Sequence, residues 1–159
     1  MPDRPVALRA LEDADLDVFF EQQQDPEARH MAAFTAADPR DRAAFDAHWD
    51  RLRSDPRVEI RTVLHAGRVA GHVIRFPQDG QLEVTYWIGR EHWGKRIATR
   101  ALEELLRELP ERPVRARVVH DNVASLRVLE KCGFRAVGRD RGFANARGED
   151  VDERILRLD

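Results

Sequence analysis

The stretch Trp93-Gly94-Lys95-Arg96-Ile97-Ala98-Thr99 decides the fold of this chain, because it joins a predicted strand to a predicted helix. Residues 82–88 before it are rich in β-branched and aromatic side chains, as strands are. Residues 97–109 carry apolar side chains at helical spacing. Three cations lie in or beside the first helical turn: Lys95, Arg96 and Arg100. A helix start is already positive, so cations there indicate a bound anion, most commonly a phosphate. The stretch therefore predicts a site for a nucleotide-like cofactor.

Outward from this turn, alternation and turn residues predict the element order β-α-α-β-β-β-α-β-α-β-β. The predicted strands cover residues 6–11, 58–65, 68–76, 81–88, 113–120, 134–139 and 150–158. The predicted helices cover residues 14–23, 39–53, 97–109 and 122–132, with Asp25-Pro26 ending the first and a loop across Gly142 and Gly148 joining the last two strands. A helix between strands 81–88 and 113–120 fits a right-handed crossover, which makes these two strands parallel. The sheet should therefore be mixed.

Composition indicates one domain over residues 1–159, with no repeat or flexible linker. A net charge of −2 provides no general basic field for nucleic acid. No apolar run reaches the roughly 20 residues that span a bilayer, and the N-terminus lacks signal-peptide features. Cys132 is the single cysteine, so no intrachain disulfide can form and we expect a cytoplasmic location. No cluster has the spacing of metal ligands, so we expect no metal.

Three segments carry a family resemblance. Residues 93–98 resemble the Gln/Arg-x-x-Gly-x-Gly/Ala turn of the GCN5-related N-acetyltransferases (GNAT): Ala98 agrees, whereas Trp93 and Arg96 depart from it. Residues 122–134 resemble the family's Asn-x-x-Ser…Glu-Lys-x-Gly-Phe segment. Thr85-Tyr86-Trp87-Ile88 is similar to its Gly-Tyr-Trp strand. Together the segments point to the branch that includes the RimJ/RimL N-acetyltransferases.

The resemblance implies an α/β (α+β) GNAT fold, with a mixed, mostly antiparallel sheet of six or seven strands and a parallel pair splayed around the cofactor. It implies direct transfer of acetyl from acetyl-coenzyme A to a primary amine, either a protein N-terminus or a small molecule. The expected partners are acetyl-CoA and an amine acceptor, without nucleic acid or membrane, and a homodimer is one option for assembly. The alternative is a coenzyme-A-binding sensor of the same fold without turnover.

The resemblance also assigns a set of cofactor-binding residues: Trp87, Ile88, Gly89, Trp93, Gly94, Lys95, Arg96, Ile97, Ala98, Thr99, Asn122 and Ser125. Arg96 replaces a glycine that lets phosphate approach the backbone. A helix start needs an ordinary negative φ, so we expect Arg96 to keep the site and place its guanidinium on a phosphate; the alternative is a weakened but tolerated site. Lys95 is either a phosphate partner or a solvated cation. Asn122 also fits a helix N-cap, and both roles can coexist.

Two residues are the catalytic candidates. Glu83, on the predicted strand at the acyl site, is the candidate base that deprotonates the amine, and its alternative is an outward-facing strand charge. His72 on the preceding strand is the second choice for the base. Many family members use a tyrosine as acid where this chain has Leu129. Ser125 is therefore the candidate proton donor to the coenzyme A thiolate, unless it only supports the Asn122 cap or a water serves instead.

Other side chains have structural or acceptor interpretations. We expect Cys132 to be a buried structural thiol rather than an acetyl-carrying nucleophile, and His120 to be packed or solvated. The acceptor site is expected around residues 22–25 and His30-Met31. Four aromatic residues could line it, although core packing is the stronger expectation for each: Phe34, Trp49, Trp87 and Trp93.

Overall fold

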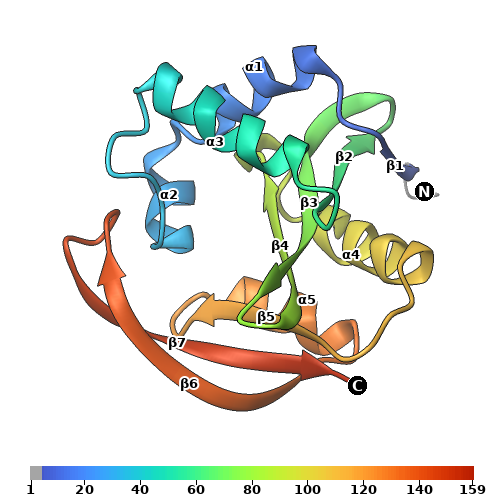
Figure 1. Ribbon diagram of the computed structural model, residues 1–159, viewed down its shortest axis with the longest axis vertical. Helices are drawn as coiled ribbons and strands as arrows, with labels where there is room; N and C mark the ends of the chain where they lie inside the picture. The colour runs from blue at the N-terminus through green and yellow to red at the C-terminus, as the bar shows by residue number, and fades with distance from the viewer. Residues whose placement is uncertain (1–4) are drawn as a thin grey trace.

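The computed structural model describes residues 5–159, and within this range a seven-stranded sheet carries helices on both faces (Figure 1). The strands are β1 (Val6–Arg9), β2 (Glu59–His65), β3 (Arg68–Gln78), β4 (Gln81–Ile88), β5 (Val114–Val119), β6 (Arg135–Ala144) and β7 (Glu149–Leu158). The helices are α1 (Asp13–Gln22), α2 (Pro26–Ala32), α3 (Arg42–Ser54), α4 (Ile97–Glu108) and α5 (Val123–Lys131), with a short 3₁₀ turn, η1 (Arg90–His92), before α4.

The sheet consists of two antiparallel parts that meet at one parallel pair of strands. Its order is β1-β2-β3-β4-β5-β7-β6, and α4 provides the crossover from β4 to β5. The parallel pairing joins Leu82 to Val114 and Glu83 to Arg115, near the start of both strands. From there the two strands diverge. The predicted mixed sheet with a splayed parallel pair is confirmed.

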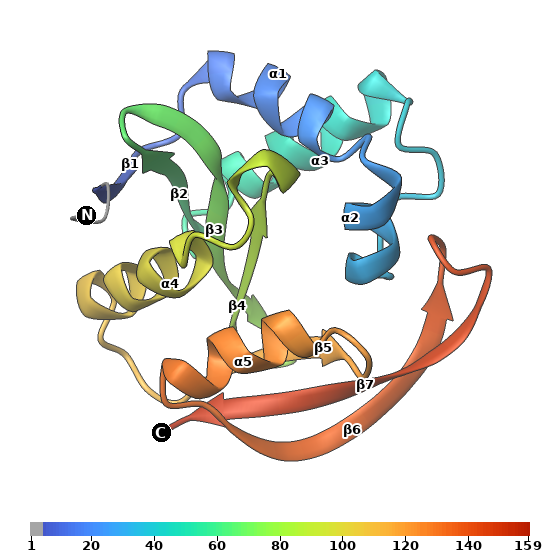
Figure 2. The same ribbon diagram turned by 180° about the vertical axis from the view of Figure 1, so that it is seen from behind.

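Each face of the sheet packs against its own helices. On one face, α4 and α5 cover the main core (Figure 2), which includes Val84 and Ile88 of β4 and the fully buried Leu102 and Leu105 of α4. Burying one leucine side chain stabilises the fold by about 1.5–3 kcal/mol. On the other face, α1 and α3 pack on β3 in a second cluster. Because side chains alternate along a strand, Glu83 lies on the opposite face of β4 from Val84.

Two element predictions are wrong. Residues 26–32 form helix α2, although Asp25-Pro26 was interpreted only as a stop signal. The Asp25 side chain caps this helix by accepting from the N–H of Glu27, and Pro26 fits a first helical position because it needs no N–H there. Strand β6 extends through Gly142 to Ala144, so most of the predicted last loop is paired with β7, which makes the long curved hairpin seen in Figure 1.

Candidate active site

A cavity of about 960 Å³ lies where β4 and β5 diverge, and it is lined from both faces of the sheet. On the α4–α5 face its wall includes Gly94, Arg96, Asn122 and Ser125, and on the opposite face it includes Glu83. Ile88 and Trp87 line the strand between them. The cavity therefore brings most of the predicted site residues together. Gly89, Lys95 and Ile97 are the three predicted residues that do not line it.

The turn before α4 presents a run of unpaired amides. Within residues 5–159, the backbone N–H groups of residues 94–99 have no hydrogen-bond acceptor, and the first bond of the helix runs from Arg100 N–H to the Arg96 carbonyl. Gly94 and Arg96 both have positive φ, of 75° and 61°. Successive amides in such a turn form an anion-binding concavity that adds to the helix dipole. A turn of this kind can accept an anion such as phosphate.

The backbone of Arg96 corrects one expectation. A negative φ was expected there, but Arg96 is the N-cap of α4 in the left-handed conformation, with φ 61° and ψ 18°. For a residue with a Cβ this conformation costs about 1–2 kcal/mol. The family's glycine at this position thus has a conformational reason as well as a steric one.

The side chains of the turn differ in their positions. Trp93 donates from Nε1 to the carbonyl of Ile88 at 2.8 Å, which fixes the turn to the end of β4. The Lys95 ammonium lies 3.4 Å from the carbonyl of Glu91, outside the cavity lining. Arg96 is exposed and lines the cavity. Of these two cations, Arg96 is thus the better placed to meet a bound anion.

Asn122 connects the two sides of the cavity. Its Oδ1 accepts from the backbone N–H of Ser125 at 3.2 Å, which makes it the N-cap of α5 as predicted. Its Nδ2 donates to the carbonyl of Met31 at the end of α2, also at 3.2 Å. Since Met31 also lines the cavity, Asn122 ties the start of α5 to the end of α2 across the cavity wall.

Ser125 has a partner that the sequence prediction did not include. Its Oγ lies 2.5 Å from the phenolic oxygen of Tyr86, and both residues line the cavity. Burial raises the pKa of Tyr86 to about 12, although the hydrogen bond with Ser125 acts in the opposite direction. Tyr86 is therefore a neutral phenol at physiological pH. The Gly-Tyr-Trp resemblance identified the strand, but nothing in the sequence indicated where the tyrosine hydroxyl would end.

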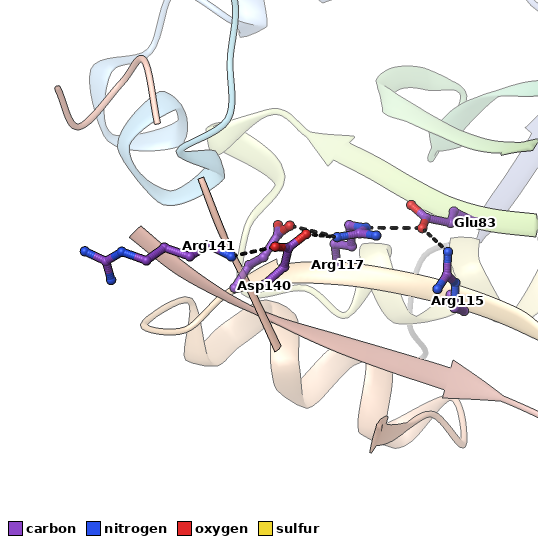
Figure 3. A network of polar contacts seen from close by, with 6 residues as sticks. Glu83, Arg115, Arg117, Asp140 and Arg141 are labelled. Carbon is purple, nitrogen blue, oxygen red and sulfur yellow. Dashed lines mark hydrogen bonds and ion pairs between the residues drawn. The ribbon is translucent and has the colours of Figure 1, made fainter. Parts of the chain in front are cut away.

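Glu83 belongs to a charged network on the other face of the sheet, and Arg117 is its central residue (Figure 3). It is 4% exposed, so the alternative of an outward-facing strand charge is wrong. Its Oε1 accepts from Arg115 at 3.1 Å and from Arg117 at 3.2 Å. Arg117 also donates to Asp140 at 2.8 Å and to Glu153 at 3.1 Å. Two arginines alternating on the neighbouring strand were the available sequence signal for this arrangement.

Glu153 is a second carboxylate in the cavity wall, and the sequence prediction missed it. Burial raises its pKa above the ordinary value, and the hydrogen bond from Arg117 opposes that shift. Glu83 and Glu153 thus share Arg117, from β4 and β7 respectively.

Three other candidates lie outside the cavity lining. His72 packs edge-on against Phe19 and Trp49, with ring centroids 4.7 and 5.0 Å apart, and burial lowers its pKa to about 3. It is a neutral core residue, so its interpretation as the second-choice base is wrong. Burial raises the pKa of the half-buried Cys132 thiol to about 11, which favours the expected structural role. His120 is exposed.

The cavity wall opposite the turn at residues 94–99 comes largely from α2. Ala28, Met31 and Ala32 line it, followed by Phe34, which is 42% exposed. The predicted acceptor segment 22–25 instead makes structural contacts: the Gln22 amide donates to the carbonyl of Ala70, and its two glutamine neighbours donate to that of Pro39. Trp49 is a core residue. Of the residues expected at the acceptor site, Met31, Phe34, Trp87 and Trp93 line the cavity.

Among residues 5–159, no group of three or more His, Cys, Asp or Glu side chains is arranged to hold a metal ion. In the same range, no helix combines the length and the apolar character needed to span a bilayer.

The family model described as "Acetyltransferase (GNAT) domain" matches residues 6–135. The chain belongs to the GNAT family. The predicted family and the predicted enzyme class, an acetyltransferase, are confirmed. Members of this family use acetyl-CoA as co-substrate.

Comparison with individual GNAT proteins agrees with this fold. An uncharacterized N-acetyltransferase, p20, of Bacillus licheniformis is 29% identical over 85 residues, which cover 51% of this chain and 48% of p20. The chain thus spans about half the length of this curated relative. The spermidine N-acetyltransferase of Vibrio cholerae, solved with CoA and spermine, superposes with a TM-score of 0.81 at 20% identity, covering 96% of this chain and 94% of the other. Mycobacterium smegmatis RimJ, solved with CoA-disulfide, gives 0.79 at 19% identity, covering 96% and 81%.

Proposed function

We propose that this GNAT protein transfers the acetyl group of acetyl-CoA directly to a primary amine. The observation that carries the proposal is the run of unpaired amides at residues 94–99, placed at a cavity that passes between two diverging strands. A pyrophosphate at this turn would satisfy donors that otherwise depend on water. The divergence of β4 and β5 gives the rest of the coenzyme a route to the opposite face.

The residues present fit such a coenzyme. A Cβ built on Gly94 would meet no other atom within 4 Å, so the space above the turn is open to a ligand. Beyond Glu83, the β5-facing edge of β4 is not paired with β5, which leaves backbone groups around Trp87 for a pantetheine chain, whereas the Ile88 carbonyl already accepts from Trp93. Thr99, Ala98 and Asn122 complete the wall on the helix side. When bound, acetyl-CoA would supply the activated thioester.

Glu83 and Ser125, the candidate base and the candidate acid, both line the cavity, from opposite faces of the sheet. Glu83, with its Oε1 held by arginines, takes one proton from the acceptor ammonium, directly or through water. The amine nitrogen then bonds to the acetyl carbon, and the carbon–sulfur bond breaks with its electron pair going to sulfur. Ser125 donates a proton to that sulfur. As the nitrogen becomes an amide it loses a second proton. This proton returns to the Ser125 oxygen and restores its hydroxyl group.

The acceptor would enter from the face formed by α2 and the β6–β7 hairpin, where Glu83 and Glu153 lie. The proposal covers primary amines as a class, including protein N-termini, as the RimJ/RimL-like motifs suggest, and polyamines. The Vibrio cholerae enzyme was solved with spermine, which supports testing polyamines, while the similarity to RimJ supports testing peptide N-termini.

Calorimetric titration with coenzyme A tests the coenzyme site. We expect Gly94→Val to raise the Kd at least tenfold, because valine strains a positive-φ position and fills the space above the turn. Gly80→Val is the matched control, since Gly80 has φ of 76° and equally open surroundings but lies in the distant β3–β4 turn. Equal effects of the two variants, or no binding by the wild type, would overturn the proposal.

Acetyl-CoA-dependent thiol release tests the reaction, with a panel of polyamines, small amines and peptides with free N-termini. We expect Glu83→Gln to lower turnover more than it changes coenzyme affinity. Glu153→Gln is the comparison, because it removes the other carboxylate bound to Arg117. Equal losses would assign the effect to the charged network rather than to Glu83. Coenzyme binding without turnover of any amine would favour the sensor alternative.

A further inference from the structure

The hydrogen bond between Tyr86 and Ser125 joins β4 to the first turn of α5 across the cavity. The two oxygens are 2.5 Å apart, and the residues come from segments 39 positions apart in sequence. The Tyr86 ring packs against the main core between the sheet and the helices, and this packing holds the phenol hydroxyl in place. Asn122 holds the backbone of Ser125 through the N-cap bond. Both members of the pair are therefore held in place from outside it.

The chemistry of the two hydroxyls decides the direction of the bond. A phenol is a stronger hydrogen-bond donor than an aliphatic alcohol, so the lowest-energy arrangement has Tyr86 donating to the Ser125 oxygen. A helical serine otherwise tends to donate back to a backbone carbonyl of the preceding turn. With Tyr86 bound to its oxygen, the serine has its own hydrogen to direct elsewhere. The cavity is the space that both residues share.

We propose that Tyr86 is a positioning residue, which orients the Ser125 hydroxyl so that its hydrogen points to the sulfur of coenzyme A. This inference rests on the proposed function, because it presumes a coenzyme in the cavity. Tyr86 keeps its proton throughout: the proton that reaches sulfur comes from Ser125. Because burial raises the pKa of Tyr86 to about 12, the phenol remains a donor over the whole range in which a thiol titrates.

The free thiol form of coenzyme A provides a probe that needs no acceptor. A donor directed at sulfur stabilises the thiolate more than the thiol, because hydrogen bonds to charged groups are the stronger ones. The affinity of the wild type for coenzyme A should therefore rise by about tenfold between pH 7 and pH 9.5, relative to desulfo-coenzyme A, which lacks the sulfur. The ratio of the two Kd values cancels changes in the phosphate site.

The test compares four proteins by calorimetry at several pH values: the wild type, Tyr86→Phe, Ser125→Ala and the double variant. Tyr86→Phe keeps the ring and removes only the hydroxyl. We expect it to lose most of the pH-dependent preference for coenzyme A, and Ser125→Ala to lose all of it. In the Ser125→Ala background, Tyr86→Phe should have no further effect, because the oriented hydroxyl is already gone.

The outcomes separate this inference from the proposed function. If the wild type binds neither coenzyme A nor desulfo-coenzyme A, the proposed coenzyme site is wrong. If both bind but Tyr86→Phe retains the wild-type pH dependence, the coenzyme site stands and the role of Tyr86 is overturned. If Tyr86 had a purely structural role, Tyr86→Phe would weaken the binding of coenzyme A and of desulfo-coenzyme A equally at every pH. That result would also contradict the proposal. Where an acceptor is found, Tyr86→Phe should lower kcat while leaving KM for acetyl-CoA unchanged.

Discussion

Arg96 occupies a position where the protein accepts local strain beside its binding turn. Its left-handed backbone forms part of the turn that carries the unpaired amides, and its side chain adds a cation to the cavity wall. The two contributions are separable, because glycine would keep the conformation without strain, whereas alanine would keep the strain without the charge. One position thus offers a test of conformation against electrostatics.

Replacing Arg96 with glycine should stabilise the protein by about 1 kcal/mol, since it removes the cost of φ 61° at a residue with a Cβ. The melting temperature should rise by about 2–4 °C, measured by thermal unfolding without ligand. Arg96→Ala is the control and should show no such gain. Both variants should bind coenzyme A with a weaker dependence on salt if the guanidinium meets phosphate. A salt dependence like that of the wild type in both would place the cation in solvent.

At the scale of elements, the bulge of β3 fixes the geometry of β4 beside the cavity. The register between β2 and β3 shifts here, so that Val63 pairs with Gly71 while Leu64 pairs with Val69. The intervening Ala70 carbonyl accepts from Gly89 N–H at 2.8 Å and from the Gln22 amide at 3.1 Å. The bulge therefore holds Gly89, which follows β4, and Gln22, the last residue of α1, at one point.

Gly71→Ala should destabilise the protein, because the new Cβ would lie 1.9 Å from the backbone carbonyl oxygen of Trp87. Overpacking of this kind costs about 1–3 kcal/mol, and here the obstacle is backbone rather than a flexible side chain. Gly138→Ala in β6 is the control, since its Cβ would meet Ile155 at an ordinary 3.8 Å. Urea unfolding measures both. Similar free energies of unfolding for the two variants would contradict the close approach.

The elements that could be predicted are those with a strong local pattern. The alternation of β4, the apolar stripe of α4 and the Asn122 cap all appear in the sequence and in the structure. Helix α2 was missed because an Asp-Pro pair can end one helix and begin another, and its short apolar content does not decide between them. The φ of Arg96 and the partner of Tyr86 depend on packing between distant segments, which periodicity does not contain.

At the scale of the whole molecule, His72 should make the stability of the protein depend on pH in mildly acidic solution. His72 has a pKa of about 3 in the folded protein and an ordinary value near 6.5 when unfolded. Between these values the unfolded chain binds a proton that the native protein does not, so stability falls as the pH is lowered below 6.5. The loss from this residue should be about 2 kcal/mol between pH 7.5 and pH 5.

His72→Phe tests this contribution, because phenylalanine can keep an edge-on ring against Phe19 and Trp49 without a titrating group. The difference in unfolding free energy between wild type and variant should change by about 2 kcal/mol from pH 7.5 to pH 5, in favour of the variant. Chemical denaturation at the two pH values measures it. If the difference in unfolding free energy between the two proteins were the same at both pH values, His72 would take up a proton in the native protein as it does in the unfolded chain.

The short pairing of β4 with β5 means that the two antiparallel parts of the sheet are joined by hydrogen bonds at one end only. Strands β1 to β4 form one antiparallel part, strands β5, β7 and β6 form the other, and the two parts are joined by the pairs at Leu82 and Glu83. From Glu83 to Ile88 the free edge is five residues, or roughly 16 Å at about 3.3 Å per residue. Over that length, a rotation of about 5° of one part of the sheet about the Leu82 and Glu83 pairs would widen the gap between β4 and β5 near Ile88 by roughly 1.4 Å. A small rotation would thus change the width of the gap between β4 and β5 while the strand pairing within each part of the sheet stays intact.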